Sequence, residues 1–339
     1  MAESAALSKT KLLIVAPAWV GDMVMAHSLV LTLLQNDPDI EIHMLAPPGT
    51  EPLARRMPGV ARTVEFDLAH GELALAKRRR IGKGLAATGY ATAIVLPNSF
   101  KSALTPWWAG IPKRTGWLGE ARIGFLNDRR RLDGKRYPLM IERFMALGLP
   151  PGTPLEAPYP IPELTVDEQN AAGKMSELGL NVKTPVTVLC PGAEFGITKR
   201  WPAEHYAEVA RHVVSLGHQV WLIGSPKDMK VCRAIENLVP NGLTNLAGKT
   251  SLLDAVDLLA QAERVVTNDS GLMHIASALG IRVVAIFGST TPDFTPPLGR
   301  EAQVVRNNLP CSPCFQRECP LGHMNCLNEL TPRQVIEVL

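Results

Sequence analysis

The sequence predicts an α/β protein made of two doubly wound, Rossmann-like domains with parallel sheets. Short apolar strand candidates alternate with helical stretches along all 339 residues, a pattern typical of parallel sheets covered by helices. A chain of this length exceeds one compact core, so two domains are expected. Six of the fifteen residues in Leu149–Glu163 are proline, which prevents a helix or an interior strand there.

We interpret residues 149–163 as a linker that ends a first domain, 1–163, and precedes a second, 164–339. Apolar runs in the first half predict strands at Leu12–Ala16, Ile40–Leu45, Thr63–Phe66 and Ala93–Leu96. Helices are expected to begin near Met23, Pro52, Gly71 and Ser102. In the second half the predicted strands are Val186–Cys190, Gln219–Ile223, Arg264–Thr267 and Val283–Phe287. The helices predicted there are Val166–Leu178, Ala203–Leu216, Lys227–Leu238, Leu252–Gln261 and Leu272–Leu279.

The composition is that of an ordinary globular protein, with 46% hydrophobic and 20% charged residues. No run reaches the ~18 apolar residues that a membrane span needs. Asp22 interrupts the one stretch that resembles an export signal, so we expect a cytoplasmic location. Residues 1–165 hold 20 Lys and Arg against 15 Asp and Glu, whereas residues 166–339 hold 15 against 17. The excess of positive charge in residues 1–165 is too small to predict nucleic-acid binding, and no recognised nucleic-acid-binding motif accompanies it.

Asp22 stands alone among apolar residues in Ala16–His27 (APAWVGDMVMAH). The run Lys11–Ala16 is apolar enough for a buried parallel strand, and Met23–Leu34 for a covered helix. Asp22 therefore lies where a strand's carboxyl end leads into a helix, the edge at which open α/β sheets bind ligands. Two roles fit this place: a general base facing a substrate, or an acid that caps the helix.

A second loop at a strand end, Pro191–Pro202 (PGAEFGITKRWP), has the composition of a diphosphate site. Lys199 and Arg200 supply positive charge just before a helix, whose N-terminus also attracts anions. The loop is not a Walker A motif, and no Gly-x-Gly-x-x-Gly follows the first strand, so an NAD site loses its main support. Small residues allow a ligand to approach the backbone closely: Gly192, Ala193 and Gly196.

The segment Thr267–His274 (TNDSGLMH) also follows a strand. Asp269 and Ser270 are suited to cap the next helix, while Gly271 leaves its N–H groups open to an anion. A plain helix cap without a ligand is the simpler alternative. His274 lies one turn inside the helix, and both a site residue and a packed core histidine fit that position.

Long blocks dispersed along the chain resemble the heptosyltransferases of lipopolysaccharide inner-core synthesis. The resemblance implies a GT-B fold, with two Rossmann-like domains facing across a cleft. It places the acceptor mainly on the first domain and the ADP-sugar on the second. The matching blocks are WVGDMVM at Trp19–Met25, LPNSFKSAL at Leu96–Leu104, AGIPKRTGW at Ala109–Trp117, PGAEFG at Pro191–Gly196, KRWP at Lys199–Pro202, NDSGLMH at Asn268–His274 and PDFTPPL at Pro292–Leu298.

The resemblance also implies a reaction, an inverting transfer of L-glycero-D-manno-heptose from ADP-heptose to the first heptose of heptosyl-Kdo2-lipid A. Two alternatives are addition to Kdo2-lipid A one sugar earlier, and a nucleotide-sugar epimerase on the same fold. By resemblance, Asp22 is the general base and Lys199 stabilises the departing ADP, with no cofactor required for catalysis. The implied donor-binding residues are Gly192, Glu194, Thr198, Lys199, Asp228, Thr250, Ser251, Asp269, Ser270, Gly271 and His274.

The basic residues of the first half fit a phosphorylated, acylated acceptor. They also predict peripheral attachment to the inner face of the cytoplasmic membrane, because basic clusters bind anionic lipid surfaces. Solvated helix faces are the alternative explanation. The candidate acceptor contacts are Lys101, Arg114, Arg78, Arg79 and Arg80.

Residues 311–326 (CSPCFQRECPLGHMNC) contain a cluster of four cysteines. Clustered cysteines in a cytosolic protein indicate metal thiolates more than disulfides. The spacing matches no standard zinc finger, and structural zinc, an iron–sulfur cluster and free or oxidisable thiols all remain open. The four cysteines are Cys311, Cys314, Cys319 and Cys326, and tetrahedral zinc could use four ligands out of these and His323, which lies among them.

Overall fold

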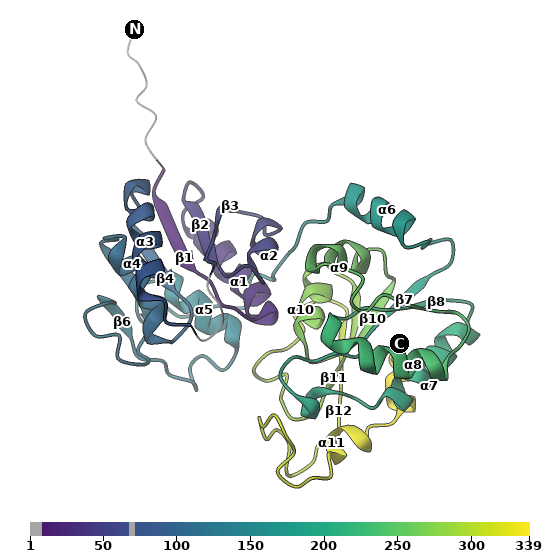
Figure 1. Cartoon of the computed structure of the whole chain (residues 1–339). Coiled ribbons are helices and arrows are strands. Elements are labelled where there is room, and N and C mark those ends of the chain that lie inside the picture. The colour runs from purple at the N-terminus through teal and green to yellow at the C-terminus, as the bar shows by residue number, and fades with distance from the viewer. Residues whose placement is uncertain (1–8, 68–71) are drawn as a thin grey trace. The chain divides into compact units, whose positions relative to one another are not determined.

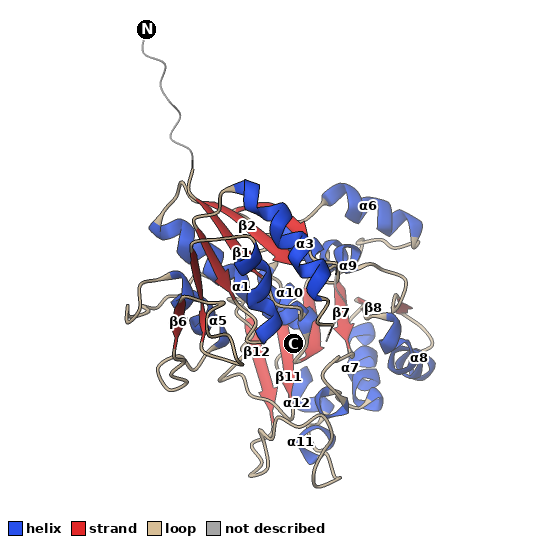
Figure 2. Ribbon diagram, turned by 60° about the vertical axis from the view of Figure 1, so that its left-hand side comes forward, coloured by secondary structure: helices blue, strands red, loops and turns tan. Residues whose placement is uncertain are grey.

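The computed structural model describes residues 9–67 and 72–339, and the chain divides into two compact units, Met1–Pro162 and Glu163–Leu339. The division falls at the end of the proline-rich segment Leu149–Glu163. Each unit has its own parallel sheet with helices packed on it (Figure 1, Figure 2).

The first unit contains a six-stranded parallel sheet in the order β3-β2-β1-β4-β5-β6 among the residues described. The order reverses between β1 and β4, and such a switch point leaves a crevice at the carboxyl ends of the two strands. The strands are β1 (Lys11–Val15), β2 (Glu41–Ala46), β3 (Val60–Glu65), β4 (Thr92–Val95), β5 (Lys113–Trp117) and β6 (Asp128–Arg130).

Helices connect these strands, with α1 packed on α5 and α3 packed on α4. The predicted helix start at Gly71 lies outside the described residues, and the helix begins at Leu75. The helices are α1 (Val20–Asn36), α2 (Glu51–Arg55), α3 (Leu75–Leu85), α4 (Leu104–Trp108) and α5 (Met140–Gly148), with 3-10 turns η1 (Ala86–Thr88) and η2 (Phe100–Ala103).

The second unit repeats this plan, with the strand order β12-β11-β10-β7-β8-β9. Its switch point lies between β7 and β10. The strands are β7 (Val186–Cys190), β8 (Gln219–Leu222), β9 (Leu243–Asn245), β10 (Arg264–Asn268), β11 (Arg282–Phe287) and β12 (Ala302–Arg306).

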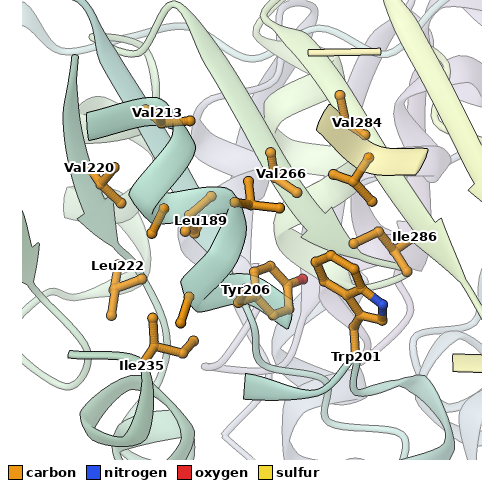
Figure 3. Close-up of a cluster of buried hydrophobic side chains, with 14 of the residues drawn as sticks. Leu189, Trp201, Tyr206, Val213, Val220, Leu222, Ile235, Val266, Val284 and Ile286 are labelled. Carbon is orange, nitrogen blue, oxygen red and sulfur yellow. The ribbon is translucent and has the colours of Figure 1, made fainter. Parts of the chain in front are cut away.

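In the second unit α7 packs against α8 and α12, and α6 packs against α9. Figure 3 shows side chains of α7 and of the central strands meeting in the core, where Trp201 and Tyr206 are at most 1% exposed. The helices are α6 (Glu168–Glu177), α7 (Ala203–Ser215), α8 (Met229–Leu238), α9 (Leu252–Leu259), α10 (Gly271–Ala278), α11 (Asn325–Asn328) and α12 (Pro332–Ile336), with 3-10 turns η3 (Ile197–Lys199) and η4 (Pro226–Asp228).

Every strand predicted from an apolar run is present, with ends shifted by a few residues. The sequence analysis did not predict α5, α11 or four of the strands, β5, β6, β9 and β12. Two of these strands, β6 (DRR) and β9 (LTN), are three-residue edge strands without an apolar run, so only pairing with a neighbour reveals them. Within residues 9–67 and 72–339, each helix is too short or too polar to cross a bilayer.

Candidate active site

The switch point of the second unit brings together two loops that the sequence singled out. The loop Pro191–Pro202 follows β7, and Asp269 and Ser270 follow β10, its neighbour in the sheet. The carboxyl ends of parallel strands share one edge, so side chains far apart in the chain meet there.

Lys199 and Asp269 form a buried ion pair across these two loops. Lys199 Nζ lies 2.5 Å from Asp269 Oδ2, with side-chain exposures of 14% and 4%. Thr290 Oγ1 donates a second hydrogen bond to the same carboxylate oxygen at 2.6 Å. The ammonium group also lies 5.1 Å from the ring centroid of Phe195. These contacts fix the cation at the edge of the sheet, where it is placed to meet an anionic ligand.

Asn268, the last residue of β10, ties the two loops and α7 together. Its side chain is fully buried and donates to the Pro191 carbonyl at 2.7 Å. Its Oδ1 accepts from the Trp201 backbone N–H at 3.2 Å and from the Tyr206 hydroxyl at 3.1 Å. The sequence reading did not name Asn268 as a site residue. The sequence feature that could have identified Asn268 is its position next to Asp269 at the end of a predicted strand.

The N-terminus of α10 carries no side-chain cap from Ser270. Ser270 occupies the N-cap position in an extended conformation without a side-chain hydrogen bond to the helix. Its hydroxyl lies 3.2 Å from the Thr267 hydroxyl instead. A plain Ser cap is therefore not what the structure contains, and Gly271 opens a helix whose first N–H groups favour an anion.

His274 lies one turn further along α10, buried beside the ion pair. Burial lowers its pKa to about 4; the nearby charge of Asp269 opposes this shift and that of Lys199 adds to it. The imidazole is therefore neutral at pH 7, when it can donate one hydrogen bond and accept another.

Gly192 and Asp228 are in contact behind the β7 loop. A Cβ atom at Gly192 would lie 2.3 Å from Cγ of Asp228, so the position has no room for a larger residue. The Asp228 carboxylate accepts hydrogen bonds from the backbone N–H and the hydroxyl of Ser225. These contacts assign Asp228 a supporting role beneath the loop.

The remaining predicted donor residues have partners of several kinds. Glu194 pairs with Lys227 on the surface. Thr198 is buried, and its hydroxyl donates to the Gln316 carbonyl at 2.5 Å. Ser251 caps α9 in a reciprocal capping box with Asp254, and Thr250 precedes it.

In the first unit, Asp22 is the third residue of α1 and is half-buried. Trp19 holds the N-cap position of this helix, so the reading of Asp22 as the N-cap residue is wrong. The carboxylate lies in the first turn, just beyond the carboxyl end of β1, and β1 adjoins β4 at the switch point. The positive end of the α1 dipole favours a carboxylate at this position.

Two of the predicted acceptor contacts, Arg78 and Arg114, instead donate hydrogen bonds to backbone carbonyls of their own unit. The guanidinium group of Arg78 is buried and donates to the carbonyls of Glu72, Leu73 and Lys101. Arg114 donates to the carbonyls of Ile111 and Phe125. Burial lowers the pKa of both groups. The other three candidates are Arg79 and Arg80, both exposed on α3, and the half-buried Lys101.

All the cysteines are free thiols, and Cys190 and Cys232 are buried in the second unit. The other four line one cavity with His323. Backbone N–H groups, that of Met324 foremost, lower the pKa of the Cys319 thiol. Burial and the neighbouring thiols raise the pKa of Cys326. Among the described residues, no three His, Cys, Asp or Glu side chains are already arranged to hold a metal ion.

Two Rossmann-like units, each with its own doubly wound parallel sheet, form the fold of the GT-B class of glycosyltransferases. Residues 78–325 match glycosyltransferase family 9 (heptosyltransferase). The chain belongs to this family and is a glycosyltransferase.

Named relatives agree along nearly the whole chain. Lipopolysaccharide heptosyltransferase 2 of Escherichia coli K12 is 43% identical over 338 residues, covering 97% of each chain. The protein of the same name from Salmonella typhimurium LT2 is 44% identical over 338 residues, again covering 97% of each. The solved structure of the E. coli ADP-heptose lipopolysaccharide heptosyltransferase II matches with a TM-score of 0.87 and 41% identity over 97% of each chain.

Proposed function

We propose that this protein transfers L-glycero-D-manno-heptose from ADP-heptose to the first heptose of heptosyl-Kdo2-lipid A. The observation that carries the proposal is the position of Lys199 at the switch point of the second unit, where it pairs with Asp269, the residue before the N-cap of α10. The names of these two relatives support the second heptose addition over the first. Family 9 membership favours transfer over epimerisation.

In this reaction the acceptor hydroxyl oxygen attacks the anomeric carbon of the donor. The bond from that carbon to the β-phosphate oxygen breaks, ADP leaves with the electron pair, and the configuration inverts. Asp22 receives the hydroxyl proton, because a carboxylate at a strand end is suited to act as a general base.

The departing ADP gains negative charge as the bond breaks. Lys199 and the N–H groups that begin α10 are fixed before the reaction, so they stabilise that charge without reorganising. We propose that these protein groups carry the leaving-group charge without a metal cofactor. Neutral His274 and the Ser270 hydroxyl then contact the phosphates or the sugar by hydrogen bonds.

We further propose peripheral attachment to the inner face of the cytoplasmic membrane through one surface of the first unit. Rings of Phe100, Phe125 and Trp107 pack edge to face, and the Trp107 side chain is 42% exposed. The basic helix α3 packs against α4, which carries Trp107, and exposes Arg79 and Arg80. Exposed aromatic rings beside cations suit the headgroup region of an anionic bilayer.

The activity is tested by measuring ADP release from ADP-heptose with heptosyl-Kdo2-lipid A, with Kdo2-lipid A and with no acceptor. We expect release only with the heptosylated acceptor. Asp22→Asn should lower kcat by about 10²–10⁴ while ADP still binds. Asp39→Asn, an exposed acid in the same unit, is the control and should keep full activity. Release without acceptor would instead support the epimerase.

Attachment is tested by co-sedimentation with vesicles of neutral lipid, with and without anionic lipid. Arg79→Glu/Arg80→Glu and Trp107→Ala should each weaken binding to the anionic vesicles. The matched control, Lys230→Glu/Arg233→Glu on α8, removes the same charge from the second unit and should bind as wild type does. Equal loss in both charge variants would contradict the proposed surface.

A further inference from the structure

The segment between β12 and α11 encloses a small cavity lined by sulfur. Cys311, Cys314, Cys319 and Cys326 all border it. The space measures about 20 Å³, which is room for one atom-sized occupant. A single metal ion fits in that space.

Other groups around the cavity point to an occupant. Ser289 is 1% exposed and borders the space, and its hydroxyl has no hydrogen-bond partner among the described residues. An unpartnered buried hydroxyl costs free energy unless something in the cavity meets it.

The donor set selects the kind of ligand. Cys311 and Cys314 form a C-x2-C pair, and Cys319 and Cys326 supply the opposite pair. Cysteine side chains that border one small space are a donor set that a metal ion can gather. His323 also borders the cavity, but its Nδ1 accepts a hydrogen bond from the Asn325 N–H at the start of α11. Four sulfur ligands are the set that tetrahedral zinc prefers in structural sites.

We propose that Cys311, Cys314, Cys319 and Cys326 bind one zinc ion, which cross-links the Cys-rich segment internally and so preserves its contacts with the loop that carries Lys199. On binding, the four thiols turn inward over the cavity and lose their protons to solvent. The residues between Cys311 and Met324 form no helix or strand, so the ion supplies the cross-link that regular structure does not provide.

The contacts of this segment with the rest of the unit show what the ion would stabilise. Gln316 accepts the hydrogen bond of Thr198, the neighbour of Lys199, at 2.5 Å. Phe315 N–H donates to the Ser289 carbonyl at 2.8 Å. The guanidinium carbon of Arg317 lies 5.5 Å from the ring centroid of Phe195, whose ring is also in contact with Lys199.

The binding test uses the full chain, purified in reductant and titrated with Co²⁺ as a spectroscopic probe. We expect one ion per chain, with the visible and charge-transfer absorption of tetrahedral thiolate-bound Co²⁺, displaced by one equivalent of Zn²⁺. Elemental analysis of the zinc-loaded protein should give the same stoichiometry. Absence of thiolate absorption, with all thiols reduced, would overturn the proposal.

Variants separate this site from the other cysteines. Cys314→Ser and Cys319→Ser should each lose most of the bound metal, whereas Cys232→Ala should keep one ion per chain. Removal of zinc by a chelator should speed amide hydrogen exchange in residues 195–200 while β7 and β10 stay protected. Retention of metal in both serine variants would contradict the site. Unchanged hydrogen exchange in residues 195–200 would contradict its role in stabilising that loop. Neither readout depends on the sugar substrate.

Discussion

Lys199 Nζ and Asp269 Oδ2 lie 2.5 Å apart and join the loops after β7 and β10, two strands that are neighbours in the sheet. Asp269 is buried and Lys199 is only 14% exposed, so each charge depends on the other. It lies at the edge where the strand order reverses, which connects the position of the cation directly to the topology.

Removing either partner of this pair should be costly. Lys199→Met or Asp269→Asn alone should each lower the free energy of unfolding by about 3–5 kcal/mol. Each variant leaves the remaining charged group largely buried without its partner. The double variant should lose less than the sum of the two. Urea unfolding of the four proteins measures this coupling, and strictly additive losses would show that the pair does not interact.

Asn268 should stabilise the site through its three partners. Asn268→Ala should lower the free energy of unfolding by about 2–4 kcal/mol, since it leaves the Pro191 carbonyl and the Trp201 N–H buried without their partner. Tyr206→Phe removes only one of the bonds and should cost about 1 kcal/mol. Thermal and urea unfolding measure both. Equal losses in the two variants would contradict the linking role of Asn268.

His274 predicts a pH dependence of stability. Its pKa in the folded protein is about 4, below the ordinary value of 6.5, with Asp269 and Lys199 facing it. Above pH 6.5 both states are neutral and the histidine contributes no penalty. As pH falls from 6.5 to 4 the unfolded state binds the proton first, so stability decreases by on the order of 3 kcal/mol.

The measurement is the difference in unfolding free energy between wild type and His274→Gln from pH 7.5 to 4. Taking the difference removes the contribution of the carboxylates that titrate in the same range. A difference that stays flat across the interval would show that the folded pKa of His274 is not lowered.

Gly192 should tolerate no side chain while Asp228 is present. Gly192→Ala should lower the free energy of unfolding by about 1–3 kcal/mol, because the new Cβ collides with the Asp228 carboxylate. Adding Asp228→Ala should recover part of that loss. Gly173→Ala in α6, where nothing lies within 4 Å of the added atom, is the control and should not destabilise. Stability measured by urea unfolding decides the outcome, and no recovery in the double variant would contradict the contact.

The amino-acid sequence determined the alternation of strands and helices. Apolar runs such as Val186–Cys190 bury on both faces whatever surrounds them, so local composition was enough to find them. Once the strands were located, the loops after their carboxyl ends could be predicted as candidate ligand-binding loops. The sequence motifs in these loops indicated the family. The sequence did not predict strands such as β6 and β9, because a short polar edge strand forms only through pairing with its neighbour.

Tertiary structure alone decided which of the named residues meet and what their polar groups do. Lys199 and Asp269 are seventy positions apart, and only the adjacency of β7 and β10 brings them together. Arg78 belongs to a basic run that suggests a charged surface, yet its guanidinium group is buried against backbone carbonyls. Charge and spacing are local properties of a sequence, whereas burial and partnership depend on how distant segments pack, and these set the chemistry of each group.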